Sequence, residues 1–107
     1  MKSIQEIQAE NASWVQANFP HHNTDHPLLG VIEEVGELCH AVLKRKQNIR
    51  TEEDHIEKER DAIGDIVIFL MDYCTCRGYD LTTVVNEVWE KVRLRDWRKD
   101  PSGVGKV

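Results

Sequence analysis

The chain has 107 residues and carries 14 basic and 19 acidic side chains, for a formal net charge of −5. This length is typical of one domain with one modest core, and we expect residues 1–107 to form a single domain. The negative charge argues against a broad nucleic-acid-binding surface. The sequence shows no secretory signal and no run of roughly 20 apolar residues, so we expect a cytoplasmic protein without membrane contact.

Only 3 prolines and 6 glycines interrupt the aliphatic stretches, which favours long helices and an all-α fold. The first helix is expected over residues 3–18 and is capped by Ser3. Its apolar positions are Ile4, Ile7, Trp14 and Val15. The helix ends before Pro20, and residues 19–27 form a loop whose last residue, Pro27, fits the first turn of the next helix.

The second helix is expected from Leu28 to about Lys46, where basic residues suit the negative end of the helix dipole. Residues 48–50 form a short link. Thr51 then begins the third helix, because acidic residues follow it in the first turn, where the dipole favours them. This helix runs to Arg77.

Gly78 ends the third helix and Asp80 caps a fourth. The core face of this fourth helix is expected to consist of Leu81, Val84, Val85, Val88, Trp89 and Val92. Residues 99–107 are expected to form a flexible tail.

Five acidic residues lie in the two most apolar segments of the chain. These are Glu33, Glu34, Glu37, Asp61 and Asp65. At about 100° per residue the three glutamates share one helix face, and the two aspartates lie one turn apart. Antiparallel pairing of the second and third helices would bring both sets together, and their repulsion would then require a cation. Because every donor is an oxygen, the pattern favours Mg²⁺, with Mn²⁺ as the alternative.

Acidic residues on amphipathic helices are usually solvated, and spacing alone leaves this explanation and the metal site evenly balanced. Gly36 and Gly64 favour the metal site. Each glycine costs about 1 kcal/mol inside a helix, and a close approach of the two helices beside the acids would explain both.

Residues 29–38, Leu-Gly-Val-Ile-Glu-Glu-Val-Gly-Glu-Leu, resemble the E-E-x-x-E segment of the MazG-like, all-α nucleoside triphosphate pyrophosphohydrolases. Residues 63–67, Ile-Gly-Asp-Ile-Val, resemble the second segment of that family. A third element, made of Asn86, Lys91 and Arg95, is similar to the polar residues that the family uses on its substrate. The resemblance spans roughly residues 14–97.

The resemblance implies a four-helix MazG-like domain whose helical bundle is completed by oligomerisation, as a homodimer or a homotetramer. It also implies Mg²⁺-dependent cleavage of a (deoxy)nucleoside triphosphate to the monophosphate and pyrophosphate. Glu34, Glu37 and Asp65 would hold the metal. Glu33 would be a further ligand, or the base that orients and deprotonates the attacking water.

One position departs from the family pattern. The second segment of the family reads E-x-x-D, but the residue three before Asp65 is Ala62. Asp61, four residues before Asp65, would substitute as a metal ligand with a shorter arm, or water would fill the vacancy. The departure bears on the number of metal ions and on the catalytic rate.

Lys91 and Arg95 lie four residues apart on one helix face and would clamp the β- and γ-phosphates. Trp14 and Trp97 are candidates to stack on the base, as is Phe19, although packing explains the two tryptophans equally well. For Trp89, packing in the core or in a dimer interface is the better explanation.

Two other functions stay open at this point. Glu37 with His40, and Glu52 with His55, form Glu-x-x-His pairs of the kind that bind di-iron in helical bundles. Alternatively, Ala62 in place of the family's glutamate is compatible with a helical dimer that binds a nucleotide or a partner protein without turnover.

The remaining metal-binding residue types are expected to be structural. The spacing of the histidines in residues 19–27 has no helical or hairpin geometry behind it, so we expect a solvated loop. The cysteines do not match the spacing of zinc ligands, and we expect reduced packing residues. The three cysteines are Cys39, Cys74 and Cys76.

Overall fold

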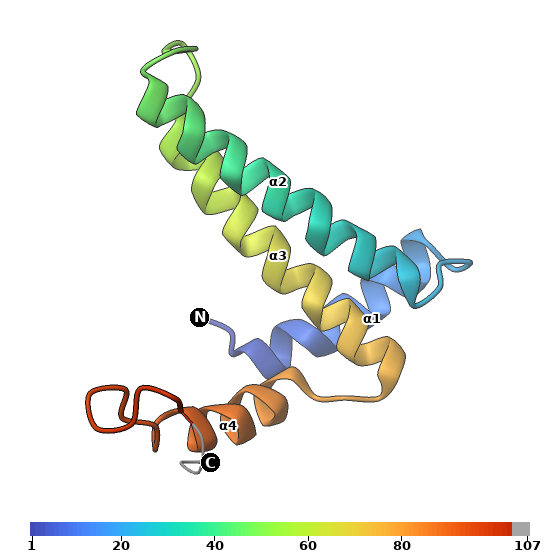
Figure 1. Ribbon diagram of the computed structural model, residues 1–107. Coiled ribbons are helices and arrows are strands. Elements are labelled where there is room, and N and C mark those ends of the chain that lie inside the picture. The colour runs from blue at the N-terminus through green and yellow to red at the C-terminus, as the bar shows by residue number, and fades with distance from the viewer. Residues whose placement is uncertain (104–107) are drawn as a thin grey trace.

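The computed structural model describes residues 1–103, which fold into four α-helices without a β-strand. The helices are α1 (Ile4–Asn18), α2 (Asp25–Gln47), α3 (His55–Arg77) and α4 (Leu81–Val92). α2 and α3 form a long antiparallel hairpin (Figure 1). α1 and α4 lie at the end of this hairpin that is opposite the link between α2 and α3. Among these helices α3 contacts all the others, whereas α2 contacts only α3. The all-α, four-helix prediction is confirmed.

Local capping explains why the first and fourth helices begin where the sequence predicts. Ser3 Oγ accepts a hydrogen bond from the Glu6 amide at 3.1 Å, and Glu6 Oε1 accepts one from the Ser3 amide at 3.0 Å. At the other end of the chain, Gly78 leaves α3 with a left-handed φ of 74°. Asp80 Oδ2 then accepts from the Thr83 amide at 3.0 Å and caps α4.

The start of α2 differs from the prediction. The helix begins at Asp25 rather than Leu28, so that residues 19–24 alone connect it to α1. The reason is that Asn23 Oδ1 accepts a hydrogen bond from the Asp25 amide at 3.0 Å, which starts the first turn early. Pro27 still lies in that first turn, as predicted, where a missing backbone N–H does no harm.

The predicted start of α3 at Thr51 is wrong. Asp54 is the cap, because its Oδ1 accepts from the Glu57 amide at 3.0 Å, and the helix begins at His55. The link is longer than expected because Asn48 and Arg50 both adopt left-handed conformations, with φ of 55° and 51°. As a result, the acidic residues 52–54 lie in the link between α2 and α3 rather than in the first turn of α3.

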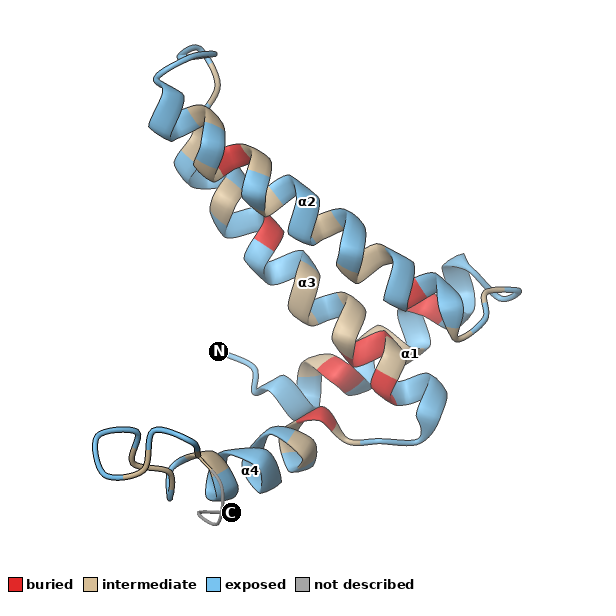
Figure 2. Ribbon diagram, in the orientation of Figure 1, coloured by how far each residue is buried: buried red, intermediate tan, exposed pale blue. Residues whose placement is uncertain are grey.

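The buried core cluster lies where α1, α3 and α4 meet (Figure 2). Met71, Cys74 and Leu81 form its buried cluster. Beside them Gln8, only 8% exposed, donates to the Tyr79 carbonyl at 2.9 Å and accepts from the Leu81 amide at 2.8 Å. The side chain of Gln8 thus satisfies the backbone of the α3–α4 turn, where each unpaired buried group would cost about 1–3 kcal/mol.

Much of the predicted apolar surface is not covered within one chain. On α4 only Leu81 is buried, while Val85, Val88 and Trp89 are 56%, 52% and 57% exposed. On α2, Ile32 is 71% exposed. The expected core face of α4 is therefore mostly a surface in the single chain.

The expectation of a close helix approach at Gly36 and Gly64 is wrong. A Cβ built at either glycine would meet nothing within 4 Å. The close approach in the hairpin is at Gly30 instead, where a Cβ would come within 2.5 Å of the Phe69 ring. A side chain at that position would displace the Phe69 ring, because the ring occupies the space that the side chain would need.

Part of the predicted tail, residues 99–103, lies in the described part of the chain. Residues 99–103 continue a series of turns, in which the Asp100 amide donates to the Asp96 carbonyl at 2.8 Å and the Gly103 amide donates to the Asp100 carbonyl at 3.1 Å. Residues 104–107 lie outside the described part of the chain. In the described part, no helix is both long enough and apolar enough to cross a bilayer.

Candidate functional site

The antiparallel hairpin brings the acidic residues of α2 and α3 together. Glu34 is half-buried on α2, and the charge of Asp65 on α3 acts on it across the hairpin. Burial raises the pKa of Glu34 above its ordinary value of 4.5, and the negative charges of Asp65, Glu33 and Glu37 raise this pKa further. The structure therefore gathers the predicted acids into one negatively charged patch, which we call the acidic cluster (Glu33, Glu34, Glu37 and Asp65).

Within the acidic cluster the four residues differ in exposure. Glu34 is the only half-buried member, whereas Glu33, Glu37 and Asp65 are exposed. Glu33 also lines a surface pocket with His26, Leu29, Gly30 and Phe69. The cluster is thus open to a ligand from solvent, with Glu34 at its base.

Asp61 and Ala62 occupy different environments on α3. Ala62 is 2% exposed in the face of α3 that packs in the hairpin, whereas Asp61 is exposed. Asp61 does not figure among the charges that raise the pKa of Glu34. The structure thus brings Asp65, but not Asp61, into electrostatic contact with Glu34.

The donor set of the acidic cluster fits a hard divalent cation. Its four side chains offer only carboxylate oxygens, which is the ligand type that Mg²⁺ and Mn²⁺ prefer. Within residues 1–103, no three of these acids bring their oxygens within 4.8 Å of one another. Holding one ion between them therefore requires rotation of the exposed side chains, which long glutamates on a helix surface allow.

The predicted substrate residues on α4 lie apart from this cluster. α4 contacts α1 and α3 but not α2, which carries the three glutamates. Asn86 donates to the Thr82 carbonyl at 2.8 Å and lines a pocket between α1, α3 and α4. Lys91 is exposed near the end of α4, and Arg95 lies beyond that end, half-buried, in a second pocket with Trp97. One chain does not bring these residues onto the acidic cluster.

The aromatic candidates also have separate positions. Trp14 is 55% exposed and packs edge-to-face on Phe19, with ring centroids 5.8 Å apart. Trp97 is 56% exposed and covers Gly103. Both tryptophans keep a large exposed surface, so both are available for stacking or for contact with another chain.

The two Glu-x-x-His pairs do not form a di-iron site in the described residues. Glu52 lies in the turn before α3, and His55 makes a contact of 3.0 Å with the Ile49 carbonyl. His40 Nε2 lies 3.4 Å from Arg50. These partners point the imidazoles to the link between the helices, and the pairs do not meet in one group of ligands.

The raised pKa of Glu34 predicts a pH-dependent stability. A carboxyl whose pKa is higher in the folded state favours folding below its unfolded pKa, and this contribution is lost as the pH rises through the folded value. In metal-free protein, Glu34→Gln should therefore have a higher Tm than the wild type at pH 7–8, with a difference that shrinks as the pH falls toward about 4.5 and stays small below it. Thermal denaturation of both proteins across this range measures it.

Glu87→Gln is the matched control, since Glu87 is an exposed glutamate on α4, away from the acidic cluster. Its Tm should follow the wild type across the same pH range. A Glu34→Gln variant that is less stable than the wild type at pH 7–8 would contradict the repulsion among these acids.

Comparison with known proteins relates the chain to nucleotide hydrolases. The profile of the MazG nucleotide pyrophosphohydrolase domain family matches residues 23–98. A "dATP/dGTP diphosphohydrolase" of Cyanophage S-2L is 26% identical over 101 residues, which cover 94% of this chain and 84% of that protein.

A solved structure gives the same relationship at the level of the fold. It is the Cyanophage S-2L MazG-like pyrophosphohydrolase bound to dGDP and three catalytic Mn²⁺ ions per active site. The similarity has a TM-score of 0.61 with 24% sequence identity, and covers 90% of this chain and 82% of the other. The two chains share a fold.

Proposed function

Because this chain belongs to the MazG family of nucleotide pyrophosphohydrolases, we propose that it converts a (deoxy)nucleoside triphosphate to the monophosphate and pyrophosphate with Mg²⁺ or Mn²⁺. The observation that carries the proposal is the acidic cluster, in which Glu34 is half-buried among three other carboxylates. Like charges in such proximity are costly unless a cation compensates them. The position of the cluster on α2 and α3 coincides with the two segments that resemble the family.

The residues of the acidic cluster take the roles that the family resemblance implies. Glu34, Glu37 and Asp65 hold the divalent cation, and Asp61 is a further candidate ligand in place of the missing carboxylate at Ala62. A bound divalent cation neutralises phosphate charge and lowers the pKa of water. Glu33, exposed at the rim, positions the attacking water and accepts its proton, or adds a further ligand.

The other predicted residues would bind the substrate. Lys91 and Arg95 supply positive charge for the phosphates, and Asn86 supplies an amide for hydrogen bonds. Trp14 and Trp97 offer exposed aromatic faces for the base. Because α4 does not contact α2 in one chain, these residues would reach an acidic cluster most directly in an oligomer.

We therefore propose a homodimer or homotetramer as the active form. The exposed apolar residues on α2 and α4 support it, because exposed apolar helix faces are usually covered by a partner. In such an assembly, α4 of one subunit would lie near the hairpin of another.

The cyanophage relatives suggest where to begin with substrates. One is named for dATP and dGTP, and the other was solved with dGDP and Mn²⁺. Purine deoxynucleoside triphosphates are thus the first choice of substrate for this chain.

Product analysis over a panel of ribo- and deoxyribonucleoside triphosphates, with Mg²⁺ or Mn²⁺, tests the proposal. The expected products are pyrophosphate and the monophosphate, formed only with the metal and fastest with a purine deoxynucleotide. Release of inorganic phosphate and a diphosphate would overturn the proposed bond cleavage.

The same panel distinguishes the non-catalytic alternative, which the burial of Ala62 at the family's glutamate position favours. Nucleotide binding by folded protein without any turnover would identify a binding module. In that case the missing carboxylate at position 62 would be the first explanation to examine.

A further inference from the structure

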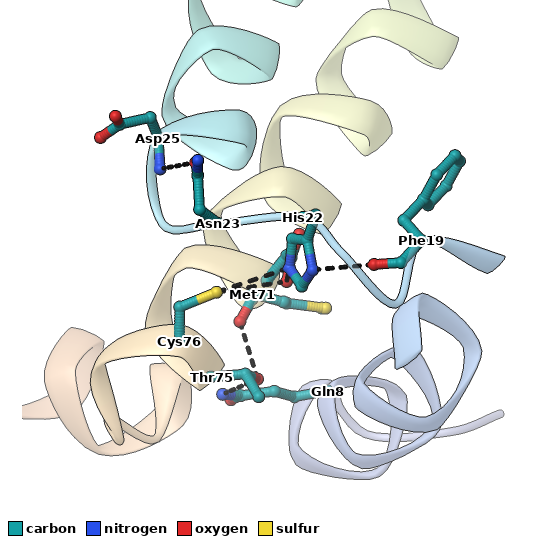
Figure 3. Close-up of polar contacts among 9 residues, drawn as sticks. Gln8, Phe19, His22, Asn23, Asp25, Met71, Thr75 and Cys76 are labelled. Atoms are coloured by element: carbon teal, nitrogen blue, oxygen red, sulfur yellow. Dashed lines mark hydrogen bonds and ion pairs between the residues drawn. The ribbon is translucent and has the colours of Figure 1, made fainter. Parts of the chain in front are cut away.

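A second group of metal-ligand side chains lies about two helical turns along α3 from Asp65 of the acidic cluster. His22, in the loop between α1 and α2, faces Asp72 and Cys76 on the last turns of α3. In Figure 3 the His22 ring points toward the Cys76 sulfur, and dashed lines mark its polar contacts. Within residues 1–103, these are the three residues of the described chain whose ligand atoms all lie within 4.8 Å of one another.

The separations of the three ligand atoms fit the edges of a coordination tetrahedron. His22 Nε2 lies 3.1 Å from Asp72 Oδ1 and 3.6 Å from Cys76 Sγ, and Sγ lies 3.8 Å from Oδ1. Ideal zinc bond lengths give tetrahedral edges of about 3.3 Å for N···O and about 3.6 Å for the two edges to sulfur. Each observed separation is within a few tenths of an ångström of its expected edge.

The His22 ring is already oriented for this role. Its Nδ1 lies 3.1 Å from the Phe19 carbonyl, which can only accept a hydrogen bond, so Nδ1 carries the hydrogen. When the ring is neutral, the lone pair of Nε2 is then directed at Asp72 and Cys76. A backbone carbonyl that holds the other ring nitrogen is the usual outer partner of a metal-bound histidine.

Two of the three side chains are largely shielded from solvent, whereas Cys76 is exposed. The side chain of His22 is 17% exposed and that of Asp72 is 11% exposed. Asp72 and Cys76 lie four residues apart, so one face of α3 presents both donors. The loop between α1 and α2 then supplies the third donor from 50 residues away in the sequence.

From this geometry we propose that His22, Asp72 and Cys76 bind one Zn²⁺ ion, with water as the fourth ligand. The mixed nitrogen, oxygen and sulfur set favours zinc over Mg²⁺, which prefers oxygen alone. The ion would tie the loop before α2 to the end of α3. The site does not depend on the proposed hydrolase function, because it shares no residue with the acidic cluster.

Protons compete with Zn²⁺ for the ligand atoms of His22, Asp72 and Cys76. In the metal-free protein Cys76 Sγ lies as a donor 3.8 Å from Asp72, and a protonated His22 would form an ion pair with that carboxylate. Zn²⁺ replaces these protons on the ligand atoms and releases them to solvent. A test of the site therefore needs a signal that only a metal–ligand bond produces.

Replacement with Co²⁺ gives a direct test on the full chain. A cobalt–thiolate bond produces a charge-transfer absorption that the all-oxygen acidic cluster cannot produce. We expect this band at one equivalent of Co²⁺ in the presence of excess Mg²⁺, and we expect Zn²⁺ to bleach it. Zn²⁺ at saturating concentration should also raise Tm by at least about 5 °C.

Cys76→Ser should abolish the band and weaken Zn²⁺ binding by more than about tenfold, since even an outer-shell partner is worth that much. The matched control is Cys39→Ser, which removes another exposed thiol, on α2, and should keep both signals. His22→Gln should reproduce the loss seen with Cys76→Ser. A band that persists in Cys76→Ser, or no band in wild-type protein that is folded by circular dichroism, would overturn the proposal.

Discussion

Glu37→Gln and Asp65→Asn should each reduce the rate of pyrophosphate release by at least about 100-fold, because loss even of an outer-shell partner of a metal ligand costs 10- to 100-fold. Both substitutions keep the shape of the side chain and remove its negative charge. Both residues are exposed, so the fold should survive. The measurement is kcat with the best nucleotide of the panel at saturating Mn²⁺.

Glu57→Gln is the matched control for this experiment. Glu57 is an exposed glutamate on α3, in the first turn and distant from Asp65 along the helix. Its kcat should stay within about twofold of the wild type, as for a surface substitution without a role. Wild-type kcat in both Glu37→Gln and Asp65→Asn would contradict the proposed metal site.

Asp61→Asn, measured in the same assay, tests whether Asp61 is a metal ligand. If Asp61 replaces the family's glutamate as a ligand, its loss should approach that of Asp65→Asn. The structure favours a smaller effect, because the charge of Asp61 does not contribute to the raised pKa of Glu34 whereas that of Asp65 does. The ratio of the two rates thus measures how far Asp61 compensates for Ala62.

The helices that could be predicted from the sequence are those whose ends depend on local chemistry. Ser3, Gly78 and Asp80 each act on a backbone group within a few residues, and the ends they control agree with the prediction. The starts of α2 and α3 were missed by three and four residues, respectively. At the start of α2, the side chain of Asn23 accepts a hydrogen bond from the Asp25 amide. Before α3, the left-handed conformations of Asn48 and Arg50 set where the helix begins.

The acidic cluster could be predicted from the sequence because its formation depends on only two features of the chain. Helical spacing places the glutamates together, and a short link forces α2 and α3 to pair antiparallel, which brings Asp65 to Glu34. Gly36 and Gly64 do not mark a close approach of the two helices, because a glycine inside a helix can have several causes. Gly36 and Gly64 face open space, and the crowded position is Gly30, whose aromatic neighbour lies on another helix.

The group formed by His22, Asp72 and Cys76 was not found from the sequence. One signal was present, since Asp72 and Cys76 have the four-residue spacing of ligands on one helix face. The third member depends on how residues 19–24 cross the end of α3, which is a tertiary contact without a local pattern. The spacing of the three cysteines by itself indicates only packing residues.

If the chain forms the proposed oligomer, Val88→Lys should convert it to a monomer and lower kcat by at least about tenfold. Val88 is 52% exposed on the apolar face of α4, beside Val85 and Trp89, so the lysine is tolerated in a free subunit. In an interface the same lysine would be a buried, unpaired charge, which costs several kcal/mol and dissociates the subunits. Sedimentation velocity measures the mass of the particle.

Glu87→Lys separates this effect from a general effect of charge. It places a lysine at the neighbouring position, about 100° around the helix and off the apolar face, and should leave both mass and activity unchanged. Val88→Lys is also expected to lower kcat, because α4 carries Asn86 and Lys91. In its own chain α4 does not contact α2, the helix that carries the three glutamates. If those residues serve the acidic cluster of a neighbouring subunit, monomers lose turnover although every residue of the chain is present. A monomeric Val88→Lys variant with full activity would show instead that one chain suffices, and would leave α4 without a part in catalysis.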